Sequence, residues 1–426
     1  MKRRFSYISV EEAFQAISDA INVGPMDSET LPVPTVYHRV LAENVVSPTN
    51  IPPHDMSHFD GFAIKSMDTN GAFLEKPVFF EVIGKKYPGQ DIECEVNHDE
   101  ACYVTTGSLL PKGADSVVAV EATKKVGEGR IKVQTEVDPY EHVFRCGSDI
   151  EKGQIVLSKG HELRSQDIIL LATLGVERVE VVKKPRVAIF CVGDELTDQP
   201  EEVKQGKVFN SLRYFLSAAT EECGGTPVYM GIVPDNITKI EKKLEEALTR
   251  ADMLLLVGGS SMGKKDFTAE AVDSVGRPGM IVHGIKRKPG RVSGFGVVKD
   301  KPVVLLPGLS HFMVVGFHAF VFPLISVMAG LSISDSRLTL KAELTETITF
   351  ETFLSFEQVT FVRLKRKRGE YLAEPCFGGS NSFRVLVNAN ALLITPPRET
   401  TVKAGEEVEV NLLPGFFSLK DILTTL

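Results

Sequence analysis

The chain has 426 residues, more than one hydrophobic core normally accommodates, so at about 100–200 residues per domain it is expected to form roughly two to four domains. The hydrophobic content of 43% and the charged content of 24% are typical of a globular protein. The formal net charge of −8 argues against a general nucleic-acid binder, which needs a basic face, but leaves room for a local basic pocket.

The N-terminal segment predicts a helix rather than a targeting sequence. Residues 9–23 have an amphipathic pattern, Ser9 and Glu12 have the spacing of a capping box, and Gly24-Pro25 ends the helix. The basic start is not followed by the apolar region of a signal peptide. The six cysteines show no C-x-x-C spacing. Reduced thiols and a cytoplasmic location are therefore expected.

A proline-rich connector leads into a β-rich region from residue 60 to about 145. Its β-branched and aromatic runs, separated by Gly and Pro, predict strands at residues 78–83, 101–105, 116–120 and 131–133. A helix follows at residues 165–175, with Ser165 as a plausible N-cap and Gly175 at its end. We expect the helices before and after the β-rich region to pack together in one discontinuous domain.

The next region alternates strands with helices. Continuous apolar runs predict strands at residues 186–192, 227–233, 253–257 and 302–306. Helices are expected at about 211–223 and 237–250. Strands that are apolar throughout are covered on both faces, and strands that alternate with helices form right-handed crossovers. The region therefore predicts a mostly parallel sheet with helices on both sides.

An apolar stretch at residues 312–331 is long enough to span a bilayer. It contains His318 and Pro323 and follows a strand through a short turn, which favours a helix buried in the protein and no membrane partner. From about residue 335 onward the chain predicts a small all-β domain without a helix before the last few residues. Within it, residues 403–406 are expected to turn into a strand.

Polar and small residues follow each predicted strand of the parallel sheet. They are Asp194, Glu195, Asp235, Gly258, Gly259, Gly308 and Ser310. The carboxyl ends of parallel strands meet at one edge, so these residues are expected to lie together. Glycines let backbone N–H groups approach an anion, and carboxylates beside an anionic ligand are compatible with bridging Mg²⁺. The basic run at 285–291 supplies positive charge for an oxyanion.

Other site chemistries have weaker signals. The chain lacks a Walker A motif and lacks G-x-G-x-x-G after the first strand, which argues against an ATPase or a dinucleotide dehydrogenase. His54, Asp55 and His58 are an alternative metal site, but their spacing suits a helix and Pro52-Pro53 predict a loop. Residues 105–115 form a polar turn that is either a hairpin connection or part of a site.

Segments with recognisable motifs occur in a fixed order over nearly the whole chain. They are residues 55–63, 106–121, 145–150 and 192–196, Asn210, Asp235, and residues 258–266, 288–290 and 306–308. In this order they resemble the MoeA family of molybdopterin molybdenumtransferases, which is also found as the E domain of gephyrin. The order over the chain is far more specific than any single motif.

The resemblance implies a multidomain fold of the α/β plus β class. The subunit is expected to be elongated, with a MogA-like α/β/α parallel-sheet domain, a β-rich domain and a C-terminal β-barrel. We place the helical domain I at residues 1–53 and 146–182, domain II at 54–145, domain III at 183–332 and domain IV at 333–426. A homodimer is implied, with the active site between domain III and domain II of the partner subunit. Contacts with other molybdenum-cofactor enzymes, but not with nucleic acid, are expected.

The resemblance also implies a reaction. Molybdate or tungstate is inserted into adenylylated molybdopterin with Mg²⁺, and AMP is released. The implied catalytic residues are Asp60, Asp149, Glu195, Asp235 and Asp266, of which the last three are also the implied metal ligands. The implied binding residues are Thr106, Gly258, Gly259, Ser261, Lys286, Lys288, Arg291, Pro307, Gly308 and Ser380.

The chain departs from the family's motifs at several positions. Val192 stands where the family has Thr, and Lys264 stands where it has an acid. After Leu-Pro-Gly, the family's Asn-Pro is replaced by Leu309-Ser310. Two alternatives remain open on the sequence: a catalytically divergent paralogue that binds a pterin or nucleotide without inserting metal, and an adenylyltransferase that acts on the pterin.

Overall fold

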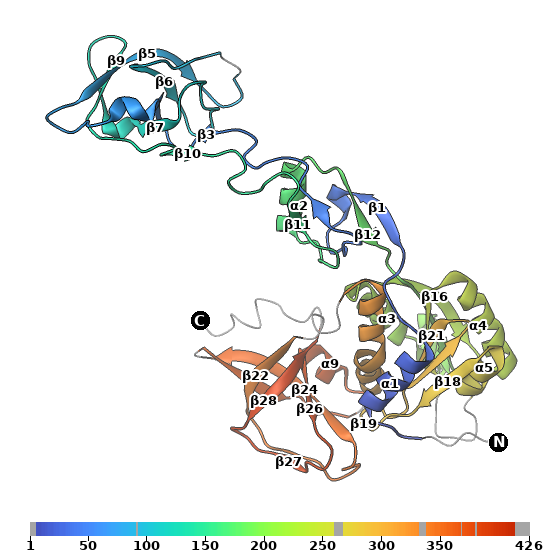
Figure 1. The fold of residues 1–426 in the computed structure, drawn as a ribbon. Helices are drawn as coiled ribbons and strands as arrows, with labels where there is room; N and C mark the ends of the chain where they lie inside the picture. Colours follow the sequence, from blue (N-terminus) through green and yellow to red (C-terminus); the bar gives the residue numbers. More distant parts are fainter. Residues whose placement is uncertain are drawn as a thin grey trace.

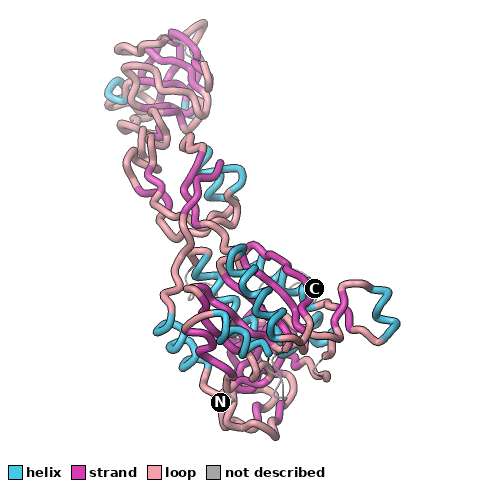
Figure 2. The backbone as a smooth tube through the Cα atoms, turned by 90° about the vertical axis from the view of Figure 1, so that its right-hand side faces the viewer, coloured by secondary structure: helices cyan, strands magenta, loops and turns pink. Residues whose placement is uncertain are grey.

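The molecule is elongated in the computed structural model. A β-rich part lies at one end, a narrow part lies in the middle, and a parallel sheet with a C-terminal barrel lies at the other end (Figure 1; Figure 2). The structure describes residues 6–90, 93–259, 267–331, 338–367, 369–379 and 381–413.

The predicted N-terminal helix is confirmed as α1 (Val10–Ala20). The Glu12 N–H donates to Ser9 Oγ at 3.0 Å, and the Ser9 N–H donates to Glu12 Oε2 at 2.6 Å, so the capping box is complete. These bonds satisfy backbone donors that a helix start otherwise leaves without partners.

The two helices that flank the β-rich part do not pack together. Val10 of α1 belongs to the same buried cluster as residues of the parallel sheet. Helix α2 (Ser165–Thr173) contributes Leu171 to a separate cluster in the narrow part. The expectation that these helices share one core is therefore wrong, because the apolar face of α1 is buried against the sheet.

The narrow part is built from two segments that lie far apart in the sequence. Strand β1 (Ser28–Pro32) pairs antiparallel with β12 (Arg178–Val182), and β2 (Val45–Val46) pairs with β11 (Ile155–Leu157). Between these two segments the chain forms the β-rich end and then returns to the narrow part.

The β-rich end contains a six-stranded sheet in the order β7-β4-β6-β5-β9-β8. Its strands are β4 (Gly61–Ile64), β5 (Val78–Lys86), β6 (Glu100–Val104), β7 (Ser116–Ala119), β8 (Thr123–Lys125) and β9 (Arg130–Val133). Phe80 and Ile131 are buried at its centre. The strand predictions for this region are thus confirmed to within a few residues.

The central sheet has the order β16-β13-β17-β21-β20-β18. Its strands are β13 (Arg186–Val192), β16 (Thr226–Val233), β17 (Met253–Gly258), β18 (Pro278–His283), β20 (Gly294–Val298) and β21 (Lys301–Leu306). The first four in the order are parallel, as predicted, and β20 and β18 extend the sheet antiparallel.

Helices cover both faces of this sheet. In β13, Ile189 packs in the cluster that contains α1 and α3 (Leu212–Glu222), whereas Phe190 packs in the cluster of α4 (Ile237–Arg250) and α5 (Phe267–Val275). Successive side chains of a strand point to opposite faces, so a strand buried on both faces is apolar throughout.

The apolar stretch after β21 forms a helix inside the protein. It consists of α6 (Ser310–Gly316), a π-helical turn (Phe317–Val321) and α7 (Phe322–Met328). The helix Ser310–Met328 is long and apolar enough to cross a membrane, but 83% of its most apolar window is buried inside the molecule. Its composition is accounted for by packing between the sheet and the barrel.

The C-terminal strands close into a barrel, because β24 pairs with both β25 and β26. Its strands are β22 (Thr339–Leu344), β24 (Glu357–Lys367), β25 (Glu370–Pro375), β26 (Ala391–Thr395) and β28 (Glu407–Leu412). The turn predicted at residues 403–406 is confirmed by the start of β28. The prediction of no helix before the last residues is wrong, because α9 (Phe383–Asn388) lies between β25 and β26.

Candidate functional site

The strand ends of the central sheet meet at one edge, as predicted. Val192 at the end of β13 lies opposite Val233 of β16 on one side and Gly258 of β17 on the other. Val257 lies opposite Leu306 at the end of β21. The loops after these four strands are therefore neighbours, although more than a hundred residues separate the first from the last.

Two glycines on this edge lie where a side chain would collide with its surroundings. Gly258 has φ of 87°, and a Cβ there would lie 2.4 Å from the carbonyl oxygen of Val192. A Cβ on Gly193 would lie 2.6 Å from Glu195 Oε2. A larger residue at either position would displace the backbone or the carboxylate.

A cavity of about 220 Å³ lies at this edge. Glu195, Gly258 and Gly308 line it from the loops after the strands, as do Asn210 ahead of α3 and Ser310 at the start of α6. The C-terminal part of the chain also reaches the cavity, through Asn381 and Phe383. The cavity is thus shared between the sheet edge and the segment between β25 and β26.

Two carboxylates are held together beside the cavity. The Asp235 N–H donates to Asp194 Oδ1 at 3.3 Å, and the Asp194 N–H donates to Asp235 Oδ2 at 3.4 Å. Lys207 Nζ donates to the carbonyl oxygen of Asp194 at 2.5 Å. This pair and Glu195 concentrate negative charge at the edge, an arrangement that suits a divalent cation.

A partly buried polar network holds Asn210, which lines the cavity. The Tyr229 hydroxyl donates to Asp198 Oδ2 at 2.7 Å and accepts from Asn210 Nδ2 at 2.9 Å. Burial and the neighbouring Asp198 raise the pKa of Tyr229, so the hydroxyl stays protonated and keeps its role as a donor. Arg213 lies over the Tyr229 ring, 4.6 Å from its centroid, with Nε 3.3 Å from Asp198 Oδ1. Among these residues, only Asn210 was singled out in the sequence.

The predicted basic residues lie at the junction with the barrel. Lys288 belongs to β19 (Arg287–Lys288), which pairs with β24, and its Nζ donates to Thr352 Oγ1. Lys288 Nζ lies 5.0 Å and Arg291 Cζ lies 4.7 Å from the centroid of the Phe353 ring. Lys286 lies next to this pair in the sequence, and its N–H donates to the carbonyl oxygen of Ile8. These three side chains do not belong to the described lining of the Glu195 cavity.

The predicted residues from the first half of the chain lie in or beside the β-rich end (Figure 1). Asp60 Oδ1 accepts from the Thr106 N–H at 2.8 Å and from Thr106 Oγ1 at 3.1 Å. Asp149 lies where the chain returns to the narrow part, and its N–H donates to the carbonyl oxygen of Ile51. Within one chain, these residues share no described cavity with Glu195.

The structure disfavours the alternative metal site at His54, Asp55 and His58. Asp55 Oδ1 accepts from the Cys146 N–H at 2.7 Å, and the His58 ring packs 4.1 Å from that of Phe144. Among the described residues, a group of three ligand atoms close enough for one ion occurs at Asp68, His98 and Asp99 instead.

The cysteines are free thiols. Cys191 lines the cavity, where burial raises its pKa to about 12. The thiol is therefore protonated at neutral pH and is poorly suited to act as a nucleophile or metal ligand.

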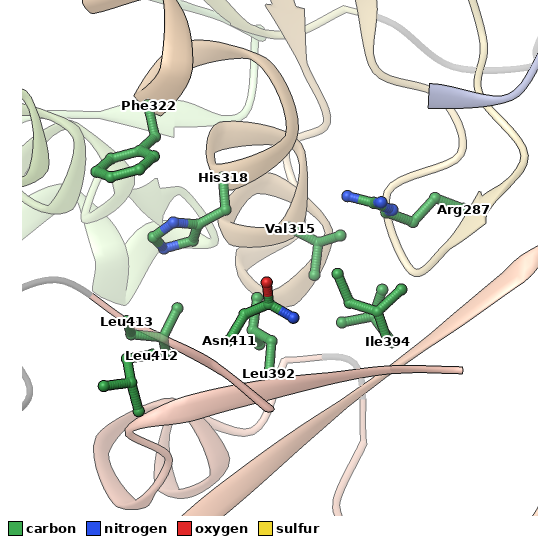
Figure 3. A pocket seen from close by; sticks show the side chains of 10 residues that line it. Arg287, Val315, His318, Phe322, Leu392, Ile394, Asn411, Leu412 and Leu413 are labelled. Atoms are coloured by element: carbon green, nitrogen blue, oxygen red, sulfur yellow. The ribbon is translucent and has the colours of Figure 1, made fainter. Parts of the chain in front are cut away.

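A second cavity lies between the buried helix and the barrel (Figure 3). Its volume is about 40 Å³, and its walls include Val315, His318 and Phe322 of the helix and Leu392 and Leu412 of the barrel. Most of its lining is apolar, and its volume is close to that of a single water molecule. We interpret it as a packing gap between two parts of the chain.

The remaining predicted site residues lie next to the strands of the sheet edge or outside the described part of the chain. Gly259 directly follows β17, and Pro307 is buried directly after β21. Ser261, Asp266 and Ser380 lie outside the described residues. The neighbours of Ser380, Asn381 and Phe383, do line the cavity.

The architecture and the acidic, glycine-lined sheet edge define a class: a multidomain α/β plus β protein with a candidate ligand site at the carboxyl ends of parallel strands. Residues 8–175 match the MoeA N-terminal region (domains I and II), residues 188–327 match the probable molybdopterin binding domain, and residues 352–413 match the MoeA C-terminal region (domain IV). The chain belongs to the MoeA family.

Individual relatives span nearly the whole chain. The molybdopterin molybdenumtransferase of Bacillus subtilis is 30% identical over 410 residues, covering 95% of this chain and 94% of the relative. That of Haemophilus influenzae is 27% identical, covering 91% and 94%. The crystal structure of the MoeA protein from Pyrococcus horikoshii OT3 has a TM-score of 0.81 at 30% identity, covering 96% of this chain and all of that chain. The resemblance and the fold class predicted from the sequence are confirmed.

Proposed function

We propose that this protein inserts molybdate, or tungstate, into adenylylated molybdopterin and releases AMP. One observation carries the proposal: in a chain of the MoeA family, the glycine loops of the sheet edge and Glu195 enclose one cavity beside the Asp194–Asp235 pair. Relatives that match over most of their length are named molybdopterin molybdenumtransferase.

The donor set at the edge fits Mg²⁺. Glu195 and Asp235 present carboxylate oxygens, which are the ligands that this small, hard cation prefers. We propose that they hold the ion together with Asp266. When bound, Mg²⁺ supplies positive charge that neutralises phosphate oxygens of the substrate. Glu195 would then orient the ion, and the glycine loops would bring backbone N–H groups against the ligand.

Other groups would complete the site. Lys286, Lys288 and Arg291 would attract the oxyanion, and the last two have their charged ends close to the Phe353 ring. Gly259, Ser261, Pro307 and Ser380 would shape the loops around the pterin.

We further propose a homodimer. Asp60 directly precedes β4 and Thr106 follows β6, and both strands belong to the β-rich end, which lies away from the central sheet (Figure 1). Asp149 lies between β10 and β11, where the chain returns to the narrow part. In a dimer of elongated subunits, the β-rich end of one chain would close the cavity of the other. We also propose a cytoplasmic location and contacts with other enzymes of molybdenum-cofactor synthesis.

The direct test is AMP release from adenylylated molybdopterin by the purified full chain with Mg²⁺, with and without molybdate. The expected result is release that requires molybdate, and tungstate is the next comparison. Release at the same rate without molybdate would contradict the transferase proposal.

One observation favours the catalytically divergent alternative. The loop after β21 carries an exposed Leu309, followed by a buried Ser310. A changed loop at the cavity would alter the fit of the substrate. Tight binding of adenylylated molybdopterin without AMP release at any molybdate concentration would establish this alternative. ATP consumption would establish an adenylyltransferase.

A further inference from the structure

Ser310 carries a buried hydroxyl at the wall of the cavity. The residue is 4% exposed and lines the cavity together with Glu195 and Gly308. Its Oγ has no hydrogen-bond partner within the described part of the chain. A buried hydroxyl without a partner destabilises a protein, so such a group commonly marks a place where a ligand or water completes the bonding.

The backbone around Ser310 offers further donors. Ser310 begins the helix Ser310–Met328, which has 19 residues. The Met313 N–H donates to the carbonyl oxygen of Leu309 at 2.8 Å, which makes this the first bond of the helix. The N–H groups that precede Met313 in the first turn have no partner within the helix, and they face the same end as the Ser310 hydroxyl.

The other residues that line the cavity indicate which chemical group of a ligand fits beside Ser310. No lysine or arginine occurs among the described residues that line the cavity. Glu195 repels anions and accepts from N–H groups, and Phe209 and Phe383 offer apolar surface to a ring. Neutral O–H and N–H donors at the Ser310 end are therefore what the cavity provides for an oxyanion oxygen.

We propose that Ser310 binds the ligand, with its Oγ–H donating to an oxygen of a tetrahedral oxyanion. The oxyanion is either the phosphate of the adenylyl group or molybdate itself. The choice of phosphate and molybdate as the two oxyanions rests on the proposed function. The arrangement of the Ser310 hydroxyl and the helix N–H groups does not depend on it.

The test compares S310A with the wild-type full chain by isothermal titration calorimetry in Mg²⁺, using AMP, adenosine and molybdate as probes. S310A is expected to weaken the binding of AMP or of molybdate about tenfold, which is the value of one hydrogen bond to a charged acceptor. Adenosine, which lacks the phosphate, should bind both proteins equally. Selective loss for AMP assigns the hydroxyl to the phosphate, and selective loss for molybdate assigns it to the metal oxyanion.

T220V is the matched control. The Thr220 hydroxyl is also fully buried and without a partner in the described structure, but it does not line the cavity. Both substitutions should raise the melting temperature without ligand, and only S310A should reduce the further rise that the bound oxyanion produces. Unchanged affinity of S310A for AMP and molybdate would overturn the proposal, as would equal weakening for AMP and adenosine or the absence of any oxyanion binding by the wild type. None of these results depends on AMP release, which tests the proposed function separately.

Discussion

The sheet edge and the β-rich end both carry acids proposed to act in catalysis, but they hold them differently. Glu195 lines a cavity whose shape is set by Gly258 and by strand ends in register. Asp60 is exposed, and among the described residues its carboxylate accepts hydrogen bonds from Thr106. Both side chains are exposed within one chain. In the proposed homodimer, the β-rich end of the partner subunit would bring Asp60 to the Glu195 cavity and close it.

The largest expected effect is on activity, and it should be similar at the two ends. E195Q and D60N each remove one negative charge with little change in shape. Each is expected to lower molybdate-dependent AMP release by about 100-fold or more, as for groups that act directly in proton transfer or charge stabilisation. E201Q is the control, because Glu201 is exposed and does not line the cavity. If E195Q loses AMP release and D60N keeps full AMP release, the β-rich end does not contribute to catalysis.

The two ends should differ in their response to backbone strain. Gly258 and Gly107 both have positive φ, of 87° and 84°. A Cβ would lie 2.4 Å from the carbonyl oxygen of Val192 at Gly258, but 3.6 Å from Pro88 Cγ at Gly107. G107A is expected to lower the free energy of unfolding by about 1–2 kcal/mol, which is the conformational term alone. G258A should cost about 1–3 kcal/mol more because of the collision. Urea unfolding monitored by circular dichroism measures both.

Equal destabilisation by the two glycine variants would contradict the idea that the sheet edge is the more tightly constrained region. Since the domains can unfold separately, each transition must be assigned before the variants are compared.

The smallest expected effect concerns pH and the β-rich end. His98 Nδ1 lies 2.5 Å from Asp68 Oδ1, and this bond raises the pKa of the exposed His98. Because the pKa of His98 is higher in the folded protein than in the unfolded chain, where it is about 6.5, the His98–Asp68 pair stabilises the folded state fully at pH values below about 6.5. This stabilisation is lost as the pH rises through the pKa of the folded protein. The difference in unfolding midpoint between the wild type and H98A should therefore be larger at pH 5.5 than at pH 8.5. A difference that grows with pH would contradict this assignment.

The sequence predicted those helices and strands that are determined by the pattern of their own residues. Residues 187–192 are a run of buried apolar residues, and the structure has β13 over Arg186–Val192, the range predicted. Strands β18 and β20 were not predicted, because Gly294 and Gly296 have low strand propensity. In the structure these glycines are needed, since Cβ atoms there would lie 3.0 Å or less from backbone atoms of β18.

Features set by tertiary contacts could not be read from the sequence. Helix α9 has only six residues and no side-chain cap, and the contact of His311 Nε2 with the carbonyl oxygen of Ser382 lies at its start. The rule that ligands bind at strand ends placed Glu195 and Gly308 at one edge. That rule carries no information on Asn381 or Phe383, which reach the cavity from a different part of the chain.

The measurement that tests the shared site most directly is subunit complementation. E195Q and D60N chains, carrying different affinity tags, are co-expressed, and the mixed dimer is purified through both tags. If each active site unites the sheet edge of one chain with the β-rich end of the other, the mixed dimer contains one intact site. It should then recover about half of the wild-type molybdate-dependent AMP release per dimer. A mixed dimer as inactive as the two parents would show that Glu195 and Asp60 do not act together across subunits.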